Sequence, residues 1–272
     1  MIPAAFDYTR AGSVEEAISQ LGGREDAKVL AGGHSLLPAM RLRVARPGLL
    51  VDIGRLSDLS YVREDGDRIA IGALTRHHDV ANSEALETGC PIVAYTAGQI
   101  GDPQVRHMGT IGGSVAHGDP ASDLPSVLLA LDAGFVVQGP NGTRTIAADA
   151  MFTSLFQTAL APNEVLTEIR VPKTTAGWSY LKFQRRAQDW AVVGVAAVRS
   201  NGGVHVGLTN MGLTPMRAAG VEEAVLAGSD PEAAAARADE GTAPPSDSFG
   251  SDEYRRELAK VLVRRALAEA LG

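Results

Sequence analysis

The chain has 272 residues, of which 45 % are hydrophobic and 21 % are charged, and its formal charge is −7. These values are typical of a globular protein with one large domain or two smaller ones. Because the charge is acidic and the basic residues are dispersed, the composition argues against nucleic acid as the main partner.

The single cysteine, Cys90, excludes an intramolecular disulfide and favours a reducing, cytoplasmic setting. An iron–sulfur cluster normally takes four cysteine ligands, so we expect none within this chain. The first residues lack the basic-then-apolar pattern of a signal peptide. No apolar run approaches the ~20 residues of a membrane helix, so the sequence predicts no transmembrane segment.

Residues 1–55 predict a small α/β lobe. Ser13 and Glu16 form a capping box at the start of a helix that ends at a glycine pair. Strands are expected at residues 28–31 and 49–53, where apolar runs follow turn residues.

A glycine turn at residues 31–38 (Ala-Gly-Gly-His-Ser-Leu-Leu-Pro) joins the first of these strands to a short helix. Gly32 and Gly33 let backbone amides approach a ligand, because glycine has no Cβ. Ser35 is expected to cap the helix, and Pro38 suits its first turn. Free amides ahead of a helix form an anion site, so this loop is predicted to bind a phosphate.

Residues 56–174 predict a second lobe. Its clearest elements are two β-hairpins, which turn at residues 65–67 and 140–142. A helix is expected over residues 91–100 and a strand over residues 164–171.

A second glycine pair lies in residues 110–114 (Thr-Ile-Gly-Gly-Ser), where it repeats the pattern of a glycine turn ahead of a helix. Two such loops could hold the two phosphates of a dinucleotide. The GxGxxG fingerprint of a Rossmann turn is absent. Since an isolated glycine pair is as readily a plain tight turn, the phosphate prediction depends on the presence of both loops.

Residues 175–272 predict an α+β C-terminal domain. Three strands are expected at residues 180–183, 191–198 and 204–209. The expected helices follow over residues 219–226, 231–239 and from 252 onward.

Two carboxylates, Asp119 and Asp123, follow the second glycine pair. Either could cap the next helix, and either could accept hydrogen bonds from ribose hydroxyls. A second cluster comprises Lys182, Arg185, Arg186, Asp189 and Trp190. It is either a solvated strand end or a face that presents charge to a ligand, with the indole stacked on a flat ring.

The histidines and the cysteine form no pattern of a metal site or an activated nucleophile. His34 is expected to hydrogen-bond the backbone rather than to act as a base, and His77 and His78 are expected to form a surface pair. Cys90 is interpreted as a buried, unreactive thiol rather than one with a lowered pKa. No Ser–His–Asp set can be assigned, and no G-x-S-x-G motif is present.

Five segments together match a known family: residues 1–6, 31–43, 110–114, 116–123 and 182–189. Through them the chain resembles, nearly end to end, the FAD-binding medium subunit of the molybdenum hydroxylases. This is the family of xanthine dehydrogenase and aerobic carbon monoxide dehydrogenase. The C-terminal part matches more loosely.

The resemblance implies an α+β fold: a two-lobed FAD-binding domain of the PCMH (vanillyl-alcohol-oxidase-like) type, residues 1–55 and 56–174, then a small α+β C-terminal domain, residues 175–272. It implies one non-covalent FAD between the lobes, with its pyrophosphate on the amides of both glycine loops. The flavin carries the chemistry, so no catalytic side chain and no metal ligand is expected. Trp190 would cover the flavin ring where relatives commonly carry a tyrosine. The residues implied to bind FAD are Lys28, Ala31, Gly32, Gly33, His34, Ser35, Leu36, Ile100, Thr110, Ile111, Gly112, Gly113, Ser114, Asp119, Asp123, Leu166, Lys182 and Trp190.

The resemblance also implies an electron-transfer role. Electrons from a molybdopterin centre in a large subunit would pass through two 2Fe–2S clusters of a small subunit to the FAD, and then to quinone, NAD⁺ or oxygen. A dimer of heterotrimers is expected in the cytoplasm, with the inner face of the membrane as an alternative location through the complex. Two other functions stay open, a stand-alone FAD-dependent oxidoreductase and a non-catalytic flavin-binding or assembly module.

Overall fold

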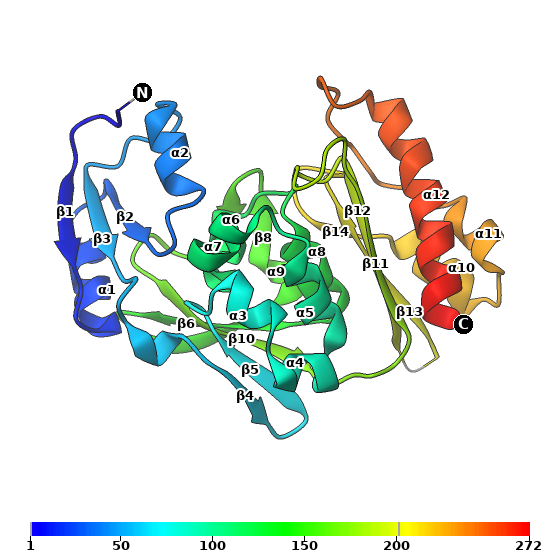
Figure 1. Ribbon diagram of the computed structural model, residues 1–272, viewed down its shortest axis with the longest axis horizontal. Helices are drawn as coiled ribbons and strands as arrows, with labels where there is room; N and C mark the ends of the chain where they lie inside the picture. Colours follow the sequence, from blue (N-terminus) through cyan, green and yellow to red (C-terminus); the bar gives the residue numbers. More distant parts are fainter. Residues whose placement is uncertain (1, 201) are drawn as a thin grey trace.

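In the computed structural model, which describes residues 2–200 and 202–272, the N-terminal lobe lies at one end of an elongated molecule (Figure 1). Its three strands pair in parallel in the order β1-β3-β2. Ser13 caps the first helix as predicted, since its hydroxyl accepts the amide of Glu16 at 3.1 Å. The elements are β1 (Asp7–Arg10), α1 (Val14–Gly22), β2 (Ala27–Leu30), α2 (Leu36–Arg41), β3 (Leu49–Asp52) and the 3₁₀ helix η1 (Ser57–Leu59).

The central part is built on a five-stranded sheet of order β4-β5-β10-β6-β7, in which every neighbouring pair is antiparallel. Both predicted hairpins are present, as β4–β5 and β6–β7. The strands are β4 (Val62–Asp65), β5 (Arg68–Gly72), β6 (Gly134–Gly139), β7 (Gly142–Ala147) and β10 (Val165–Pro172), and a separate short pair is formed by β8 (Phe152–Ser154) and β9 (Gln157–Thr158).

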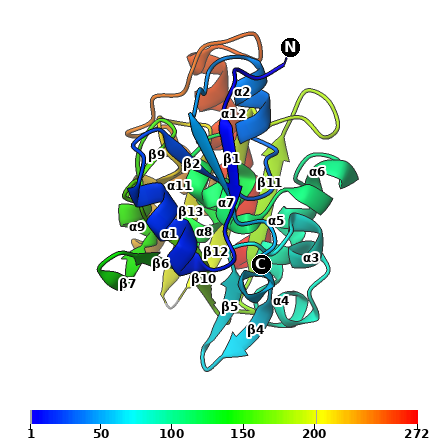
Figure 2. The ribbon, with the colours of Figure 1, turned by 90° about the vertical axis from the view of Figure 1, so that its left-hand side faces the viewer.

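Helices cover this sheet and share a hydrophobic core with it (Figures 1 and 2). Side chains such as Val93, Leu128 and Ile169 are fully buried in that core. The helices are α3 (His77–Ala81), α4 (Glu84–Gly89), α5 (Pro91–Gly98), α6 (Pro103–Met108), α7 (Ile111–His117), α8 (Asp123–Ala130) and α9 (Ala148–Met151).

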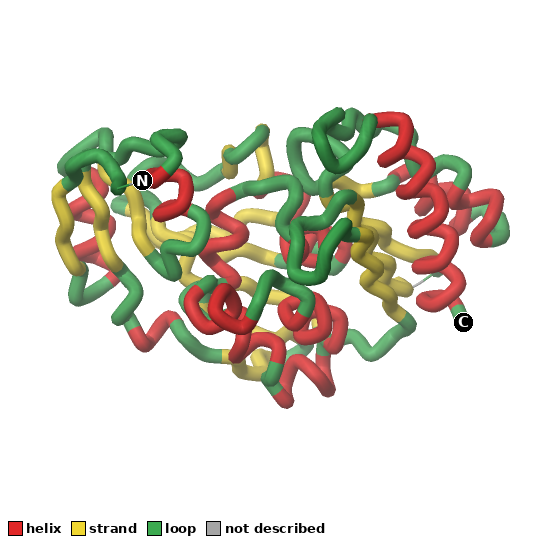
Figure 3. Tube along the Cα trace, turned by 45° about the horizontal axis from the view of Figure 1, so that its top comes forward, coloured by secondary structure: helices red, strands yellow, loops and turns green. Residues whose placement is uncertain are grey.

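The C-terminal part is a four-stranded antiparallel sheet, β11-β12-β13-β14, that packs on α8 and on the last helix, α12. Figure 3 shows this last helix, which ends at the C-terminus, beside the strands. A Cβ on Gly207 would lie 2.1 Å from the carbonyl oxygen of Ser126, so glycine is needed for α8 to approach β13 this closely. The strands are β11 (Trp178–Phe183), β12 (Val193–Ser200), β13 (Gly203–Thr209) and β14 (Met216–Arg217), and the helices are α10 (Ala219–Leu226), α11 (Pro231–Ala235) and α12 (Asp252–Leu271).

Several predicted boundaries differ from the structure. β2 covers Ala27–Leu30 rather than residues 28–31, α5 ends at Gly98 rather than at residue 100, and β11 begins at Trp178 rather than at residue 180. The helix α11 ends at Ala235 instead of residue 239, because the amides of Arg237 and Ala238 donate three residues back, as in a 3₁₀ turn. β12 begins at Val193 rather than at residue 191. None of the helices in the described part of the chain combines the length and apolarity needed to cross a bilayer.

Candidate functional site

The first glycine loop leads from β2 into α2. Gly33 has φ +74°, a left-handed conformation that favours glycine. His34 turns back as predicted, with Nδ1 3.1 Å from the Gly32 carbonyl oxygen. The prediction that Ser35 caps α2 is wrong: its backbone is already helical (φ −106°, ψ −46°) and its side chain makes no capping bond.

The backbone amides of this loop have no hydrogen-bond acceptor within the described residues. Among the described residues, none accepts a hydrogen bond from the amides of Gly32, Gly33, His34 or Ser35. His34 is exposed and the other three residues are half-buried, so an acceptor from outside the chain can reach these amides. Four consecutive free N–H groups ahead of a helix therefore form a donor array suited to an anion.

The two glycine segments lie side by side. A Cβ on Gly32 would stand 2.1 Å from the carbonyl oxygen of Met108, at the end of the helix that precedes the second segment. Arg76 donates from Nη1 to the same carbonyl oxygen. The first glycine pair therefore serves two purposes, because Gly32 permits this contact and Gly33 permits the turn.

The second segment differs from the prediction. Its glycines are not a turn ahead of a helix: Thr110 is the N-cap of α7, and its hydroxyl accepts the amide of Gly113 at 3.0 Å. The amides of Ile111, Gly112 and Ser114 donate to carbonyl oxygens of the protein itself. The expected row of free amides is thus absent from these four positions, because the helix cap and the neighbouring segment at residues 73–75 accept them. The hydroxyls of Thr110 and Ser114 remain as the donors that this segment can offer.

A buried histidine supports the second segment. His77 is 4 % exposed, and its amide donates to the Gly109 carbonyl oxygen at 3.0 Å. Burial, together with the charges of Arg106 and Arg76, lowers the pKa of His77 to about 4. The prediction of a surface pair is therefore wrong for this residue, whereas the ring of His78 stacks on that of His107 with centroids 4.0 Å apart.

Asp123 is the first residue of α8, and its carboxylate is buried against β11. Tyr180 donates to Oδ1 at 2.5 Å and Lys182 donates to Oδ2 at 2.9 Å. Burial raises the pKa of Asp123, and the charge of Lys182 partly offsets that shift. The capping prediction for Asp123 is wrong, since the residue lies within the helix after Ser122. Its contact with a ribose or ribityl hydroxyl stays a prediction.

Asp119, unlike Asp123, lies outside α8, and it does not cap that helix either. Its Oδ1 accepts the amide of Ala121 at 2.9 Å, a local turn rather than a helix cap, and burial raises its pKa. The carboxylate lines a cavity of about 250 Å³, and Trp190, whose exposure is 54 %, lines the same cavity. The structure thus brings Asp119 and Trp190 together, although they are 71 positions apart in the sequence.

The charged cluster after β11 divides into two. Lys182 points inward, with its side chain 5 % exposed, so a purely solvated strand end is excluded for it. Arg185 and Arg186 are exposed. Cys90 is fully buried and burial raises its pKa to about 12, in agreement with the predicted unreactive thiol.

The remaining predicted contacts lie around these groups. Lys28 on β2 is exposed. Burial lowers the pKa of His117 on α7, the charge of Asp119 opposes that shift, and the charge of Lys28 adds a smaller lowering, which places Lys28 near this imidazole. Leu166 is buried in β10, Ile100 is half-buried after α5, and Leu36 begins α2.

Tyr180 is the residue of this site that the sequence reasoning missed. It is fully buried, and burial together with the Asp123 carboxylate raises its pKa. A usable signal was present, because side chains two positions apart on a strand point to the same face. Because Lys182 was expected at the site, the same periodicity could have predicted that Tyr180 lies beside it.

The residues present fit a dinucleotide with a flavin. A pyrophosphate needs several N–H donors and close backbone approach, and residues 32–35 offer both. A flat ring needs an aromatic or apolar wall, and Trp190 supplies one beside the cavity. Among the described residues, no three His, Cys, Asp or Glu side chains are grouped so as to hold a metal ion.

Comparison with known proteins assigns both parts of the chain. The family described as FAD binding domain in molybdopterin dehydrogenase matches residues 4–174, and the family described as CO dehydrogenase flavoprotein C-terminal domain matches residues 178–270. Fold and site therefore define a flavoprotein. The chain belongs to the FAD-binding medium subunits of the molybdenum hydroxylases.

Individual relatives are similar to this chain over nearly the whole length of both sequences. The carbon monoxide dehydrogenase medium chain of Hydrogenophaga pseudoflava is 43 % identical over 99 % of this chain and 98 % of its own. A solved structure of carbon monoxide dehydrogenase from the same organism has a TM-score of 0.95 over 100 % of this chain and 99 % of its own, at 43 % identity. A subunit of the 6-hydroxypseudooxynicotine dehydrogenase complex of Paenarthrobacter nicotinovorans is 38 % identical over 100 % of this chain and 96 % of its own. The predicted family and the FAD-binding fold with a C-terminal domain are confirmed.

Proposed function

We propose that this chain accepts electrons from the iron–sulfur clusters of a small partner subunit and passes them from its FAD to quinone, NAD⁺ or oxygen. The observation that carries the proposal is the row of free amides at residues 32–35 in a chain of this family. FAD supplies the redox chemistry when bound, and the protein supplies binding, orientation and electrostatics.

Each group of the site has a separate task in this proposal. The amides of residues 32–35 bind the pyrophosphate, with the hydroxyls of Thr110 and Ser114 beside them. The ion pair of Asp123 and Lys182 orients the polar side of the cofactor, and Trp190 keeps water from one face of the ring. A chain with one cysteine needs partners for the clusters, which supports a complex with a molybdopterin large subunit and an iron–sulfur small subunit.

The finer points are part of the same proposal. A relative of 43 % identity is a carbon monoxide dehydrogenase subunit, so carbon monoxide is the first substrate to test for the large partner. The relative from a 6-hydroxypseudooxynicotine dehydrogenase complex makes an aromatic or heterocyclic substrate the second. We expect a dimer of heterotrimers in the cytoplasm, or at the inner face of the membrane through the complex.

The test begins with the full chain purified alone and together with the products of neighbouring reading frames. We expect flavin absorption bands that dithionite bleaches, and a stable complex that contains molybdenum and iron. Anaerobic carbon monoxide should bleach the flavin only in the complex. A chain that neither contains nor takes up FAD would contradict the proposal.

The same preparations separate the two alternatives. A stand-alone oxidoreductase would turn over with NAD(P)H and an acceptor without any partner, and would not co-purify with molybdenum. A non-catalytic flavin-binding module would bind FAD but would leave it oxidised in the complex when the substrate is added.

A further inference from the structure

Few side chains of the loop that carries Trp190, residues 184–192, form hydrogen bonds within the described part of the chain, and the bond that Arg185 makes is to a segment outside the loop. Gln188 has φ +71°, which is uncommon for a residue other than glycine. Among the described residues, none hydrogen-bonds Oε1 of Gln184 or Oδ2 of Asp189, although both atoms are buried. Within the loop, the amide of Asp189 donates to the Arg186 carbonyl oxygen at 3.2 Å. The position of the indole therefore depends on groups outside the loop.

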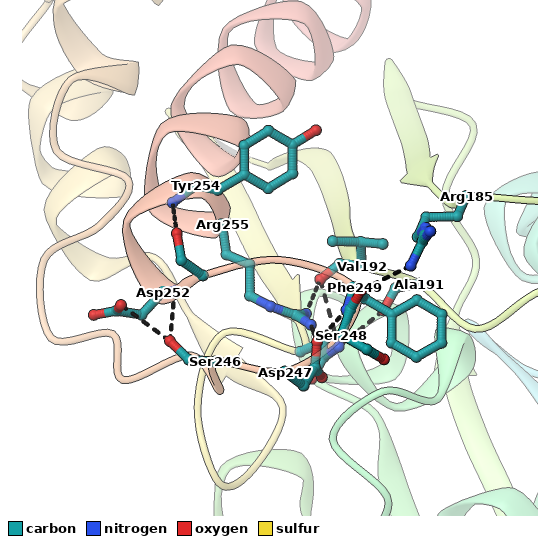
Figure 4. Close-up of polar contacts among 12 residues, drawn as sticks. Arg185, Ala191, Val192, Ser246, Asp247, Ser248, Phe249, Asp252, Tyr254 and Arg255 are labelled. Carbon is teal, nitrogen blue, oxygen red and sulfur yellow. Dashed lines mark hydrogen bonds and ion pairs between the residues drawn. The ribbon is translucent and has the colours of Figure 1, made fainter.

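Two side chains from other elements hold the backbone directly after Trp190. Nδ2 of Asn210 donates to the carbonyl oxygens of Ala191 at 2.9 Å and of Val192 at 3.4 Å. Nη1 of Arg255 donates to the Val192 carbonyl oxygen at 2.6 Å (Figure 4). We call Asn210 and Arg255 the carbonyl clamp.

Arg255 is an unusual residue to find in this position. It is 0 % exposed on α12, and Nη2 donates to Oδ1 of Asp247 at 2.7 Å. A buried guanidinium is costly unless its hydrogen bonds are satisfied. Both terminal nitrogens of Arg255 have acceptors, whereas Nε has none among the described residues, so the two bonds to Val192 and Asp247 are what fix this side chain. Both of its recorded acceptors, Asp247 and Val192, line the cavity beside Trp190.

The segment around Asp247 also contacts the Trp190 loop through Arg185. Nη1 of Arg185 donates to the Ser248 carbonyl oxygen at 2.7 Å, and its guanidinium lies 5.5 Å from the centre of the Phe249 ring. The start of α12 and the segment before it therefore contact the Trp190 loop at two points of the sequence, at Arg185 before the indole and at Val192 after it (Figure 4).

We infer that Arg255 and Asn210 are positioning residues for the flavin: they fix the carbonyls of residues 191–192 and so hold the Trp190 indole against the ring. The inference rests on the proposed function, because it needs FAD in the cavity that Trp190 lines. Without the clamp the fold persists and FAD still binds through residues 32–35, but the indole no longer stays in contact with the flavin.

The experiment measures the fluorescence of bound flavin in the full chain, because an indole in contact with isoalloxazine quenches it. The parent protein and Trp190→Phe set the quenched and released limits. The clamp variants are Arg255→Met, Arg255→Lys and Asn210→Gly. Asn210 has φ +62°, so glycine keeps the backbone conformation and removes only the amide donor. Arg264→Met is the matched control, because it removes an exposed arginine ion pair with Glu232 from the same helix.

We expect a several-fold rise in flavin fluorescence per bound FAD for Arg255→Met and Asn210→Gly, toward the Trp190→Phe value. Arg255→Lys should restore part of the quenching, and Arg264→Met should match the parent. Bound FAD is counted by absorbance after gel filtration, so released cofactor does not contribute. Should Arg255→Met fail to fold, Asn210→Gly decides alone. Parent-like quenching in the folded clamp variants would overturn the inference, whereas a parent without FAD would overturn the proposed function instead.

Discussion

The two glycine pairs of this chain share a sequence pattern but use their backbone amides in opposite ways. At residues 32–35 four amides have no acceptor among the described residues, and a left-handed glycine turns the chain. At residues 111–114 every amide already donates within the protein, and the glycines lie in the first turn of a capped helix. The first pair is built to receive a ligand, and the second is built to be rigid beside it.

This difference teaches why a glycine can matter for unrelated reasons. A Cβ on Gly112 would lie 2.5 Å from that of Ala73, and one on Gly113 would lie 2.7 Å from Oγ1 of Thr110. Those glycines are needed for packing and for the cap. Gly33 instead needs its positive φ, which an L side chain adopts only at a cost of about 1–2 kcal/mol.

The largest expected effect is at Gly33. Gly33→Val should abolish FAD retention while most of the fold survives, because a branched side chain strains the left-handed turn and its Cβ would lie 3.0 Å from Leu37 and 3.3 Å from Leu30, which displaces the amides of the loop. Its matched control is Gly66→Val, since Gly66 has φ +62° in a hairpin with open space around it and carries the same backbone strain. The ratio of flavin to protein absorbance measures the outcome, and equal stoichiometric FAD in both variants would show that the first loop is wrongly assigned.

The stability that His77 contributes beside the second glycine pair should depend on pH. His77 titrates at about 4 in the fold and at 6.5 when unfolded, so the unfolded state binds its proton first as the pH falls. Stability should therefore fall between pH 6.5 and about 4, by about 3 kcal/mol from this residue alone. Urea unfolding of His77→Gln should show a correspondingly flatter pH profile. His78→Gln is the control, and an identical profile for His77→Gln and the parent would contradict the assignment.

A smaller loss is expected at the cap of the second pair. Thr110→Val removes the hydroxyl that accepts the Gly113 amide and should cost about 1 kcal/mol of stability. Thr110→Ser keeps the hydroxyl and should stay near the parent. Chemical denaturation of the FAD-free proteins measures both. If the two variants unfold alike, the cap does not stabilise the second pair.

The sequence predicted regular elements better than it predicted how polar groups would be used. Both hairpins, the strand at β10 and the helix cap at Ser13 follow from periodicity and turn residues, which act over a few positions. The other half of the predicted capping box differs, because the Glu16 carboxylate accepts the amide of Gly12. The partner of Asp123 at Tyr180 is 57 residues away, and the burial of His77 depends on a segment 32 positions further on. Such contacts are set by tertiary packing. The same limit explains why two Gly-Gly pairs looked equivalent before their acceptors were known.

The smallest expected effect is the difference in stability loss between alanine variants of the two serines that were predicted to cap helices. Ser13 does so, and Ser13→Ala should cost about 1 kcal/mol. Ser35 makes no capping bond, so Ser35→Ala should change stability by less than about 0.5 kcal/mol. Thermal or urea unfolding of the FAD-free chain tests both variants against the parent. Because Ser35 belongs to the row of free amides and not to the cap of α2, a loss equal to that of Ser13→Ala would mean that the first loop is stabilised like the second, and the contrast between the two glycine pairs would no longer hold.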